Sequence, residues 1–188
     1  MDANPNGGDL GHSPTVLLLI DFINPLDFDG AQALAPAAVD AAHAVAALKS
    51  RVLADGGCCI YANDNYGIWR SNFPDVYRKC EGLKGPPGLI ARKLKPGPTD
   101  LTVLKPRHSA FYGTPLYLML NQLKTRQLIL CGIATDNCVL FTAMDAYVRG
   151  FELWVPANCA AAESQQVHEQ ALRHMQRVLK ADIRAAEH

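Results

Sequence analysis

Three side chains able to act together in catalysis each follow a short apolar run. Asp21 directly follows the run at residues 16–20, Lys105 follows a second run, and Cys138 lies shortly after a third. In parallel sheets, ligands bind beyond the carboxyl ends of the strands, so we expect these three residues to meet at one edge. A thiol with a carboxylate and an ammonium beside it is an activated nucleophile with a base and an electrostatic partner. The spacing therefore predicts nucleophilic chemistry at that edge.

Cys138 is the strongest candidate of the three. Thr135 or Asp136 is suited to be the N-cap of a helix predicted at residues 137–149, which places Cys138 in the first turn. The partial positive charge of a helix N-terminus favours a thiolate, and the free N–H groups of that turn are suited to hold an oxyanion. The alternative is a buried structural thiol, a common role for free cysteine.

Asp21 and Lys105 carry weaker signals when each is considered alone. An isolated Asp at a strand end is more often a turn or N-cap residue than a general base. A lysine at a strand end is by default exposed. Their joint occurrence with Cys138 makes the catalytic interpretation the stronger hypothesis.

Strands and helices alternate along the chain in the way that a parallel sheet requires. Short apolar runs predict strands at residues 16–20, 58–62, 101–104, 128–131 and 152–155. Helices are predicted at residues 36–54, after Thr114-Pro115, at 137–149, and after Ser164, where Val167, Ala171, Met175 and Val178 share a face. The expected fold is a three-layer α/β/α domain with a mostly parallel, about six-stranded, Rossmann-like sheet.

The boundary between the N-terminal tail and the domain is predicted from composition. Residues 1–13 are rich in Gly, Asn, Asp and Ser and are expected to form a flexible tail, followed by a single domain at 14–188. Residues 65–100 are rich in Gly and Pro, and so long a connection is typical of a lid, a binding loop or an interface arm.

Charge and cysteine content exclude several classes of function. Eighteen basic and 18 acidic residues give a formal net charge of zero, which argues against a nucleic-acid partner or an anionic membrane. The six cysteines form no C-x-x-C pair, and no apolar run near the start suits a signal peptide. No glycine-rich nucleotide loop follows a strand. We therefore expect a cytoplasmic protein with thiol cysteines and no cofactor.

Three sequence blocks, in order, resemble the isochorismatase-like cysteine hydrolases, which include nicotinamidase and N-carbamoylsarcosine amidase. They are Leu-Leu-Leu-Ile-Asp-Phe ending at Phe22, Lys-Pro-Arg-His-Ser-Ala-Phe from Lys105 to Phe111, and Cys-Gly-Ile-Ala-Thr-Asp-Asn-Cys ending at Cys138. The third block continues to Thr142-Ala143 and Asp145-Ala146. The resemblance covers nearly the whole chain, from about residue 16 to 181.

The resemblance implies an acyl-transfer mechanism. Asp21 would take the proton of Cys138, whose thiolate would attack an amide or ureido carbonyl and form a thioester, while Lys105 keeps the two negative charges compatible. Asp21 would then protonate the leaving amine and serve again as the base for water. A cis peptide at Ile133–Ala134 is implied, and it would aim the Ala134 N–H, with that of Cys138, at the oxyanion.

The chain departs from the nicotinamidases in one respect. Nicotinamidases bind a metal through an Asp-x-His pair and a later His. The corresponding stretch, Asn63-Asp64-Asn65, contains no histidine, so no metal is expected. These residues are suited to bind a polar substrate or merely to form a turn. His108 is expected to be a structural or pocket-lining group. The residues proposed to contact substrate are Phe22, Asn63, Asp64, Trp69, Phe111 and Ile133, although the aromatic residues among them are equally suited to the core.

Two other functions stay open. An isochorismatase-type enzyme would cleave a vinyl ether with Asp21 and form no covalent intermediate. A catalytically silent member of the fold would only bind a ligand. The leading prediction is a hydrolase of a small amide, ureide or carbamoyl compound, which is expected to form a homo-oligomer.

Overall fold

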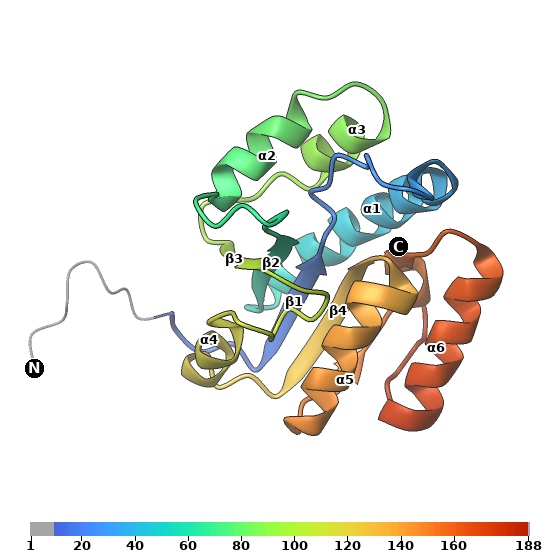
Figure 1. The fold of residues 1–188 in the computed structure, drawn as a ribbon. Coiled ribbons are helices and arrows are strands. Elements are labelled where there is room, and N and C mark those ends of the chain that lie inside the picture. The colour runs from blue at the N-terminus through green and yellow to red at the C-terminus, as the bar shows by residue number, and fades with distance from the viewer. Residues whose placement is uncertain (1–9, 188) are drawn as a thin grey trace, which may run out of the picture.

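The computed structural model describes residues 10–187 of the chain (Figure 1). Most of the expected tail, residues 1–9, therefore lies outside the described residues. Within the described part, Ser13 is buried and its N–H donates to the carbonyl of Leu123 at 2.8 Å. The expected division at residue 13 stays a prediction.

The sheet has the strand order β3-β2-β1-β4-β5, with β6 pairing onto β4. All the described strand pairs are parallel. The strands are β1 (Thr15–Ile20), β2 (Cys58–Asp64), β3 (Leu101–Lys105), β4 (Gln127–Ile133), β5 (Glu152–Trp154) and β6 (Ala160–Ala161). The predicted mostly parallel sheet of about six strands is confirmed, and β2 and β4 run two residues further than their apolar runs indicated.

Alternate residues of the central strands supply two separate cores. Leu17 and Leu19 of β1 join the core under α1 (Ala31–Ala54), α2 (Phe73–Glu81) and α3 (Pro86–Lys93). Leu18 and Ile20 face the opposite core, which includes residues of α4 (Leu116–Gln122), α5 (Leu140–Val148) and α6 (Gln165–Leu179). Because both faces of the sheet are covered, its strands are apolar throughout, and the architecture has three layers (Figure 1).

Helix α1 begins five residues earlier than predicted, and Pro36 lies inside it. A proline at this point removes only one hydrogen bond near the helix N-terminus, while the extra turn buries Ala31, Leu34 and Ala35. By length and apolar composition alone, α1 is the one described helix able to cross a membrane. The core helix of a globular protein has the same properties, and α1 packs a buried face against the sheet.

The long connection at residues 65–100 contains two helices that composition did not indicate. Helix α2 begins at the N-cap Asn72, whose side chain accepts from the N–H of Asp75 at 3.0 Å. Helix α3 begins with Pro86 and Pro87, and proline is favoured in a first turn because its missing N–H would have no partner there. The proline-rich stretch thus starts a helix, and the expected role of the segment as a lid, a binding loop or an interface arm stays a prediction.

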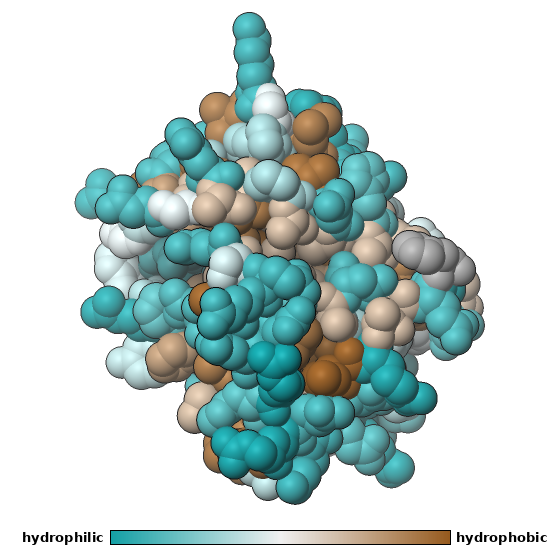
Figure 2. Space-filling view, turned by 90° about the vertical axis from the view of Figure 1, so that its right-hand side faces the viewer, coloured by the Kyte–Doolittle hydropathy of each residue, from teal (hydrophilic) through white to brown (hydrophobic). Residues whose placement is uncertain are grey.

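Helix α6 begins at the predicted N-cap Ser164, but its buried face is shifted from the predicted one. His168, Ala171, Leu172, Met175 and Leu179 are buried, whereas Val178 is exposed. The apolar spacing of Val167 and Val178 misled the prediction, because His168 finds polar partners within the fold. Figure 2 looks onto the side of the molecule where α6 lies, and hydrophilic residues cover most of that surface.

Candidate active site

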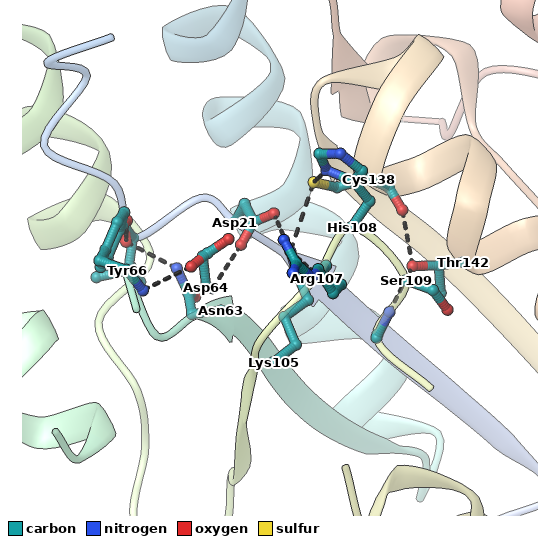
Figure 3. A network of polar contacts seen from close by, with 12 residues as sticks. Asp21, Asn63, Asp64, Tyr66, Lys105, Arg107, His108, Ser109, Cys138 and Thr142 are labelled. Carbon is teal, nitrogen blue, oxygen red and sulfur yellow. Dashed lines mark hydrogen bonds and ion pairs between the residues drawn. The ribbon is translucent and has the colours of Figure 1, made fainter. Parts of the chain in front are cut away.

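The three predicted catalytic side chains meet at the carboxyl ends of β1, β3 and β4 (Figure 3). The ammonium Nζ of Lys105 lies 2.7 Å from Oδ2 of Asp21 and 3.4 Å from Sγ of Cys138. It also donates to the carbonyl oxygen of Arg107 at 3.2 Å. Lys105 is 0% exposed, so it is not the exposed strand-end lysine that was the alternative, and Asp21 beside it is 4% exposed.

The local backbone directs Asp21 toward this centre. Asp21 follows β1 with a φ of 55°, in the left-handed region that Asp tolerates better than most residues. Its N–H donates to the carbonyl of Ala62 at 3.0 Å, which continues the ladder between β1 and β2. Its Oδ1 accepts the backbone N–H of Asp64 at 2.7 Å, so both carboxylate oxygens are held.

Gly132 allows β4 to approach β1 closely beneath the site. It pairs with Ile20, the residue before Asp21. A Cβ added at Gly132 would lie 2.7 Å from the Cβ of Ile20, and closer still to its carbonyl oxygen. A larger residue at 132 would therefore push β4 away from β1, and these strands lead into Asp21 and into the turn that holds Cys138.

Burial and the neighbouring charges both shift the pKa values of the ionisable groups of the centre. Burial raises the pKa of the Asp21 carboxyl, although Lys105 acts against it. Burial is the largest single influence on Lys105 and lowers the pKa of its ammonium, but the neighbouring charges and the hydrogen bond with Asp21 together outweigh burial and raise that pKa. Burial, together with the Asp21 charge, raises the pKa of the Cys138 thiol to about 12, and Lys105 opposes this. Burial and the Asp21 charge thus favour the thiol over the thiolate, whereas the helix position alone had suggested a thiolate.

Cys138 lies in a π-helical turn, Thr135–Val139, that leads into α5. The N-cap position belongs to Ala134 and has no side-chain cap, so the prediction of Thr135 or Asp136 as N-cap was wrong. The carbonyl of Ala134 instead accepts the N–H groups of Asn137 and Val139. The peptide bond between Ile133 and Ala134 is cis, as the resemblance implied.

A polar network fastens the lysine-bearing loop to the helix that carries the cysteine. The hydroxyl of Thr142 donates to the carbonyl of Cys138 at 2.7 Å and accepts the N–H of Ala110 at 3.0 Å. One turn further along, Asp145 accepts the hydroxyl of Ser109 at 2.5 Å. Sequence reasoning assigned no role to these groups, although Thr142 lies four residues after Cys138, the spacing at which a Thr hydroxyl reaches a helical carbonyl.

His168 supports the cysteine turn from the far side. Its Nδ1 lies 2.7 Å from the Thr135 hydroxyl, and its Nε2 lies 3.0 Å from the carbonyl of Ala157. A carbonyl only accepts, so Nε2 carries the proton and Nδ1 accepts from Thr135. Burial lowers the pKa of His168, which keeps this ring neutral. Sequence reasoning assigned no role to His168.

The polar residues predicted to bind substrate take up largely local contacts. Asn63 is 0% exposed and donates to the carbonyl of Ile23 at 2.7 Å, while its Oδ1 is buried without a partner among the described residues. Asp64 accepts the N–H of Tyr66, and Asn65 accepts the N–H of Gly67, each two residues ahead. Asp64 and Asn65 thus form the turn that was the alternative, and substrate contact by this stretch stays a prediction.

The apolar residues predicted to contact substrate differ in their exposure to solvent. Phe22 and Ile133 are buried in the core beneath α1, and Phe111 is buried in the same core as Cys138. The ring of Phe111 also lies beneath the guanidinium of Arg149, 4.8 Å from it. Trp69, in contrast, is 79% exposed. None of these placements tests substrate contact.

His108, predicted to be structural or to line the pocket, lies against the sulfur. Its Nδ1 is 3.8 Å from Sγ of Cys138, and its ring packs on Phe141 with centroids 5.3 Å apart. Figure 3 shows the imidazole beside Cys138, away from the buried Lys105 and Asp21. Because His108 is exposed, the sulfur lies between a buried ion pair and a solvent-facing ring.

Within residues 10–187, no group of three His, Cys, Asp or Glu side chains is placed to hold a metal ion. The stretch from Asn63 to Asn65 therefore does not fit the metal site of nicotinamidases. Two surface cavities of about 630 and 580 Å³ lie elsewhere, and neither is lined by Asp21, Lys105 or Cys138.

The fold and the site together define a three-layer α/β protein with a buried carboxylate–ammonium–thiol centre. The family model described as the isochorismatase domain matches residues 15–187, and the chain belongs to this family of hydrolases, which includes amidohydrolases.

Three known proteins illustrate the relationship. The uncharacterized isochorismatase family protein YaaI of Bacillus subtilis is 36% identical over 171 residues, which cover 91% of this chain and 93% of that protein. The maleamate amidohydrolase of Pseudomonas putida is 27% identical, over 85% of this chain and 77% of its own. The crystal structure of the nicotinamidase PncA from Bacillus subtilis superposes with a TM-score of 0.69 at 28% identity, covering 91% of this chain and 99% of that one.

Proposed function

We propose that the protein is a cysteine-dependent hydrolase of a small amide, ureide or carbamoyl compound, with a thioester intermediate on Cys138. One observation carries the proposal. A single buried ammonium, Nζ of Lys105, contacts both the Asp21 carboxylate at 2.7 Å and the Cys138 sulfur at 3.4 Å. A base, a nucleophile and a shared cation are the parts that covalent acyl transfer needs.

In the proposed acylation, Asp21 takes the thiol proton as the sulfur attacks the carbonyl carbon. The ammonium of Lys105 stabilises the negative charge as it passes from carboxylate to sulfur. The backbone N–H groups of Ala134 and Cys138 hold the oxyanion. When the C–N bond breaks, Asp21 returns its proton to the nitrogen, and ammonia or an amine leaves. Hydrolysis of the thioester by water then releases the acid and restores the thiol.

The raised pKa of Cys138, about 12, is compatible with this scheme. A thiol that ionises only as it attacks needs a base in contact, and Asp21 takes part in a hydrogen bond with Cys138. The same observation is compatible with the vinyl-ether hydrolase alternative, in which Asp21 works with a neutral, spectator thiol. The two reactions differ in whether Cys138 becomes acylated.

The test is a screen for ammonia release with nicotinamide, maleamate and a set of small ureides and carbamoyl amines. The variants are Cys138→Ala and Asp21→Asn, and the matched control is Cys159→Ala, which removes another buried thiol. We expect the first two to lose turnover and the control to keep it. An enzyme that keeps most of its activity in Cys138→Ala and loses it in Asp21→Asn is instead an acid-dependent hydrolase without a covalent step. If both variants keep full activity, both schemes are contradicted.

We also propose that the protein acts in the cytoplasm as a homo-oligomer. All six cysteines are free thiols, the state that a reducing compartment maintains. Phe141, Met144 and Val148 form an exposed apolar stripe on α5, which supports association between copies. Light scattering measures the mass of the protein in solution, and the mass of a single chain would contradict the proposed homo-oligomer.

A further inference from the structure

We propose that His108 is the general base of the second half-reaction, the hydrolysis of the thioester on Cys138. This assignment rests on the proposed function, because it requires an acyl group on the sulfur. It leaves Asp21 the proton transfers of acylation and assigns those of deacylation to His108, whereas the resemblance implied Asp21 as the base for both.

The two bases lie on different sides of the sulfur. Asp21 is 4% exposed, and its two oxygens are engaged by Lys105 Nζ and the N–H of Asp64. His108 is exposed, and its Nδ1 lies 3.8 Å from Sγ. Of the titratable groups that contact the sulfur, His108 is the exposed one, so a water molecule that approaches a thioester on Cys138 from solvent meets His108.

The ring is held in a direction suited to this step. It packs against Phe141 of α5 at a centroid distance of 5.3 Å, and this contact keeps Nδ1 toward the sulfur. The loop that carries His108 is fixed on both flanks. Lys105 donates to the Arg107 carbonyl before it, and Ser109 donates to Asp145 after it. A base held within reach of the acyl carbon, which is one bond from Sγ, meets the geometric requirement for general base catalysis.

The step balances in atoms and charge. Neutral His108 takes a proton at Nδ1 from a water molecule as the water oxygen forms a bond to the acyl carbon. The tetrahedral intermediate then expels the sulfur, and the C–S bond breaks with its electron pair on Cys138. The imidazolium returns its proton to that thiolate across the contact seen between Nδ1 and Sγ. The acid leaves, and Cys138 is again a thiol beside a neutral imidazole.

The experiment uses 4-nitrophenyl acetate, which acylates a reactive thiol without knowledge of the natural substrate. The burst of 4-nitrophenolate reports acetylation of Cys138, and the slower steady state reports deacylation. The variant is His108→Gln, and the matched control is His174→Gln, which removes an exposed histidine of α6. Mass spectrometry of the Cys138 peptide measures the acetyl-enzyme directly, and thermal melts confirm that each variant is folded.

We expect His108→Gln to keep the burst, to accumulate acetyl-Cys138, and to lose roughly 10²–10⁴-fold in the steady-state rate, the usual size of general base catalysis. Added imidazole should restore the rate in His108→Gly. Equal steady-state rates in the wild type and His108→Gln overturn the inference, as does a burst slowed as much as the steady state. Absence of acetyl-Cys138 in both the wild type and His108→Gln contradicts the proposed function itself, so the two failures are distinguishable.

Discussion

Asp21 raises the pKa of Cys138 and Lys105 lowers it. Replacing each of the two residues separately should reveal these opposite effects. Oδ2 of Asp21 and Sγ of Cys138 both contact Nζ of Lys105, at 2.7 and 3.4 Å, so they are at most about 6 Å apart. Two unit charges at ~6 Å and an effective dielectric constant of about 20 interact by about 3 kcal/mol. This corresponds to roughly two pKa units.

We therefore expect Asp21→Asn to lower the pKa of Cys138 from about 12 by roughly two units, because the remaining ammonium stabilises the thiolate. Lys105→Met should raise that pKa, because the carboxylate then repels the thiolate without compensation. The assay is the rate of Cys138 alkylation by iodoacetamide as a function of pH, measured peptide by peptide because the chain has six cysteines. Alkylation at a fixed pH should be faster in Asp21→Asn and slower in Lys105→Met, while both variants lose turnover.

Asp64→Asn is the matched control for loss of a carboxylate beside the site. The Asp64 side chain accepts from the N–H of Tyr66, and only its backbone N–H contacts Asp21. Alkylation in this control should follow the wild type. Alkylation that slows in both Asp21→Asn and Lys105→Met, or that changes in neither, refutes the reasoning, since burial alone would then control the sulfur.

Three further predictions concern the support of the site. Gly132→Ala should destabilise the protein by about 1–3 kcal/mol in denaturant unfolding, because the added methyl group would meet Ile20 across the strand pair. Thr142→Val should cost about 1–3 kcal/mol and lower kcat, because it deprives the buried Cys138 carbonyl of its hydroxyl donor. The lowered pKa of His168 should make the free energy of unfolding pH-dependent. This stability is fully present above the unfolded-state pKa of about 6.5 and is lost as the pH falls through the lower folded-state value, and His168→Gln should remove the dependence.

Each of these predictions has its own control. Gly82→Ala adds a methyl group whose nearest neighbour lies 3.5 Å away, so it should be tolerated. Thr142→Ser keeps the hydroxyl and should keep kcat. His174→Gln should retain the pH dependence of the wild type. Equal stability of Gly132→Ala and Gly82→Ala would contradict the close approach of β1 and β4, and an unchanged pH dependence in His168→Gln would assign the titration to another group.

Local pattern was sufficient for five strands of the sheet and for the candidates at its edge, but it did not indicate the two-residue strand β6 (Ala160–Ala161). Short apolar runs indicate buried strands wherever they occur, and residues that directly follow such strands must lie at the carboxyl edge of a parallel sheet. This is why Asp21, Lys105 and Cys138 were identified together before any distance was known. Composition failed in the long connection, where Pro86 and Pro87 initiate a helix although proline is usually associated with loops.

The sequence by itself determined the alternation of strands and helices, the residues at the sheet edge, and the family to which the chain is similar. Only the tertiary structure decided that Lys105 is buried between Asp21 and Cys138, that burial and the Asp21 charge raise the pKa of the thiol, and that the exposed His108 lies against the sulfur. It also decided that His168 fills a core position where an apolar face had been expected. The physical reason is that spacing along the chain encodes local periodicity, whereas burial, desolvation and pairing of charges depend on which distant segments come into contact.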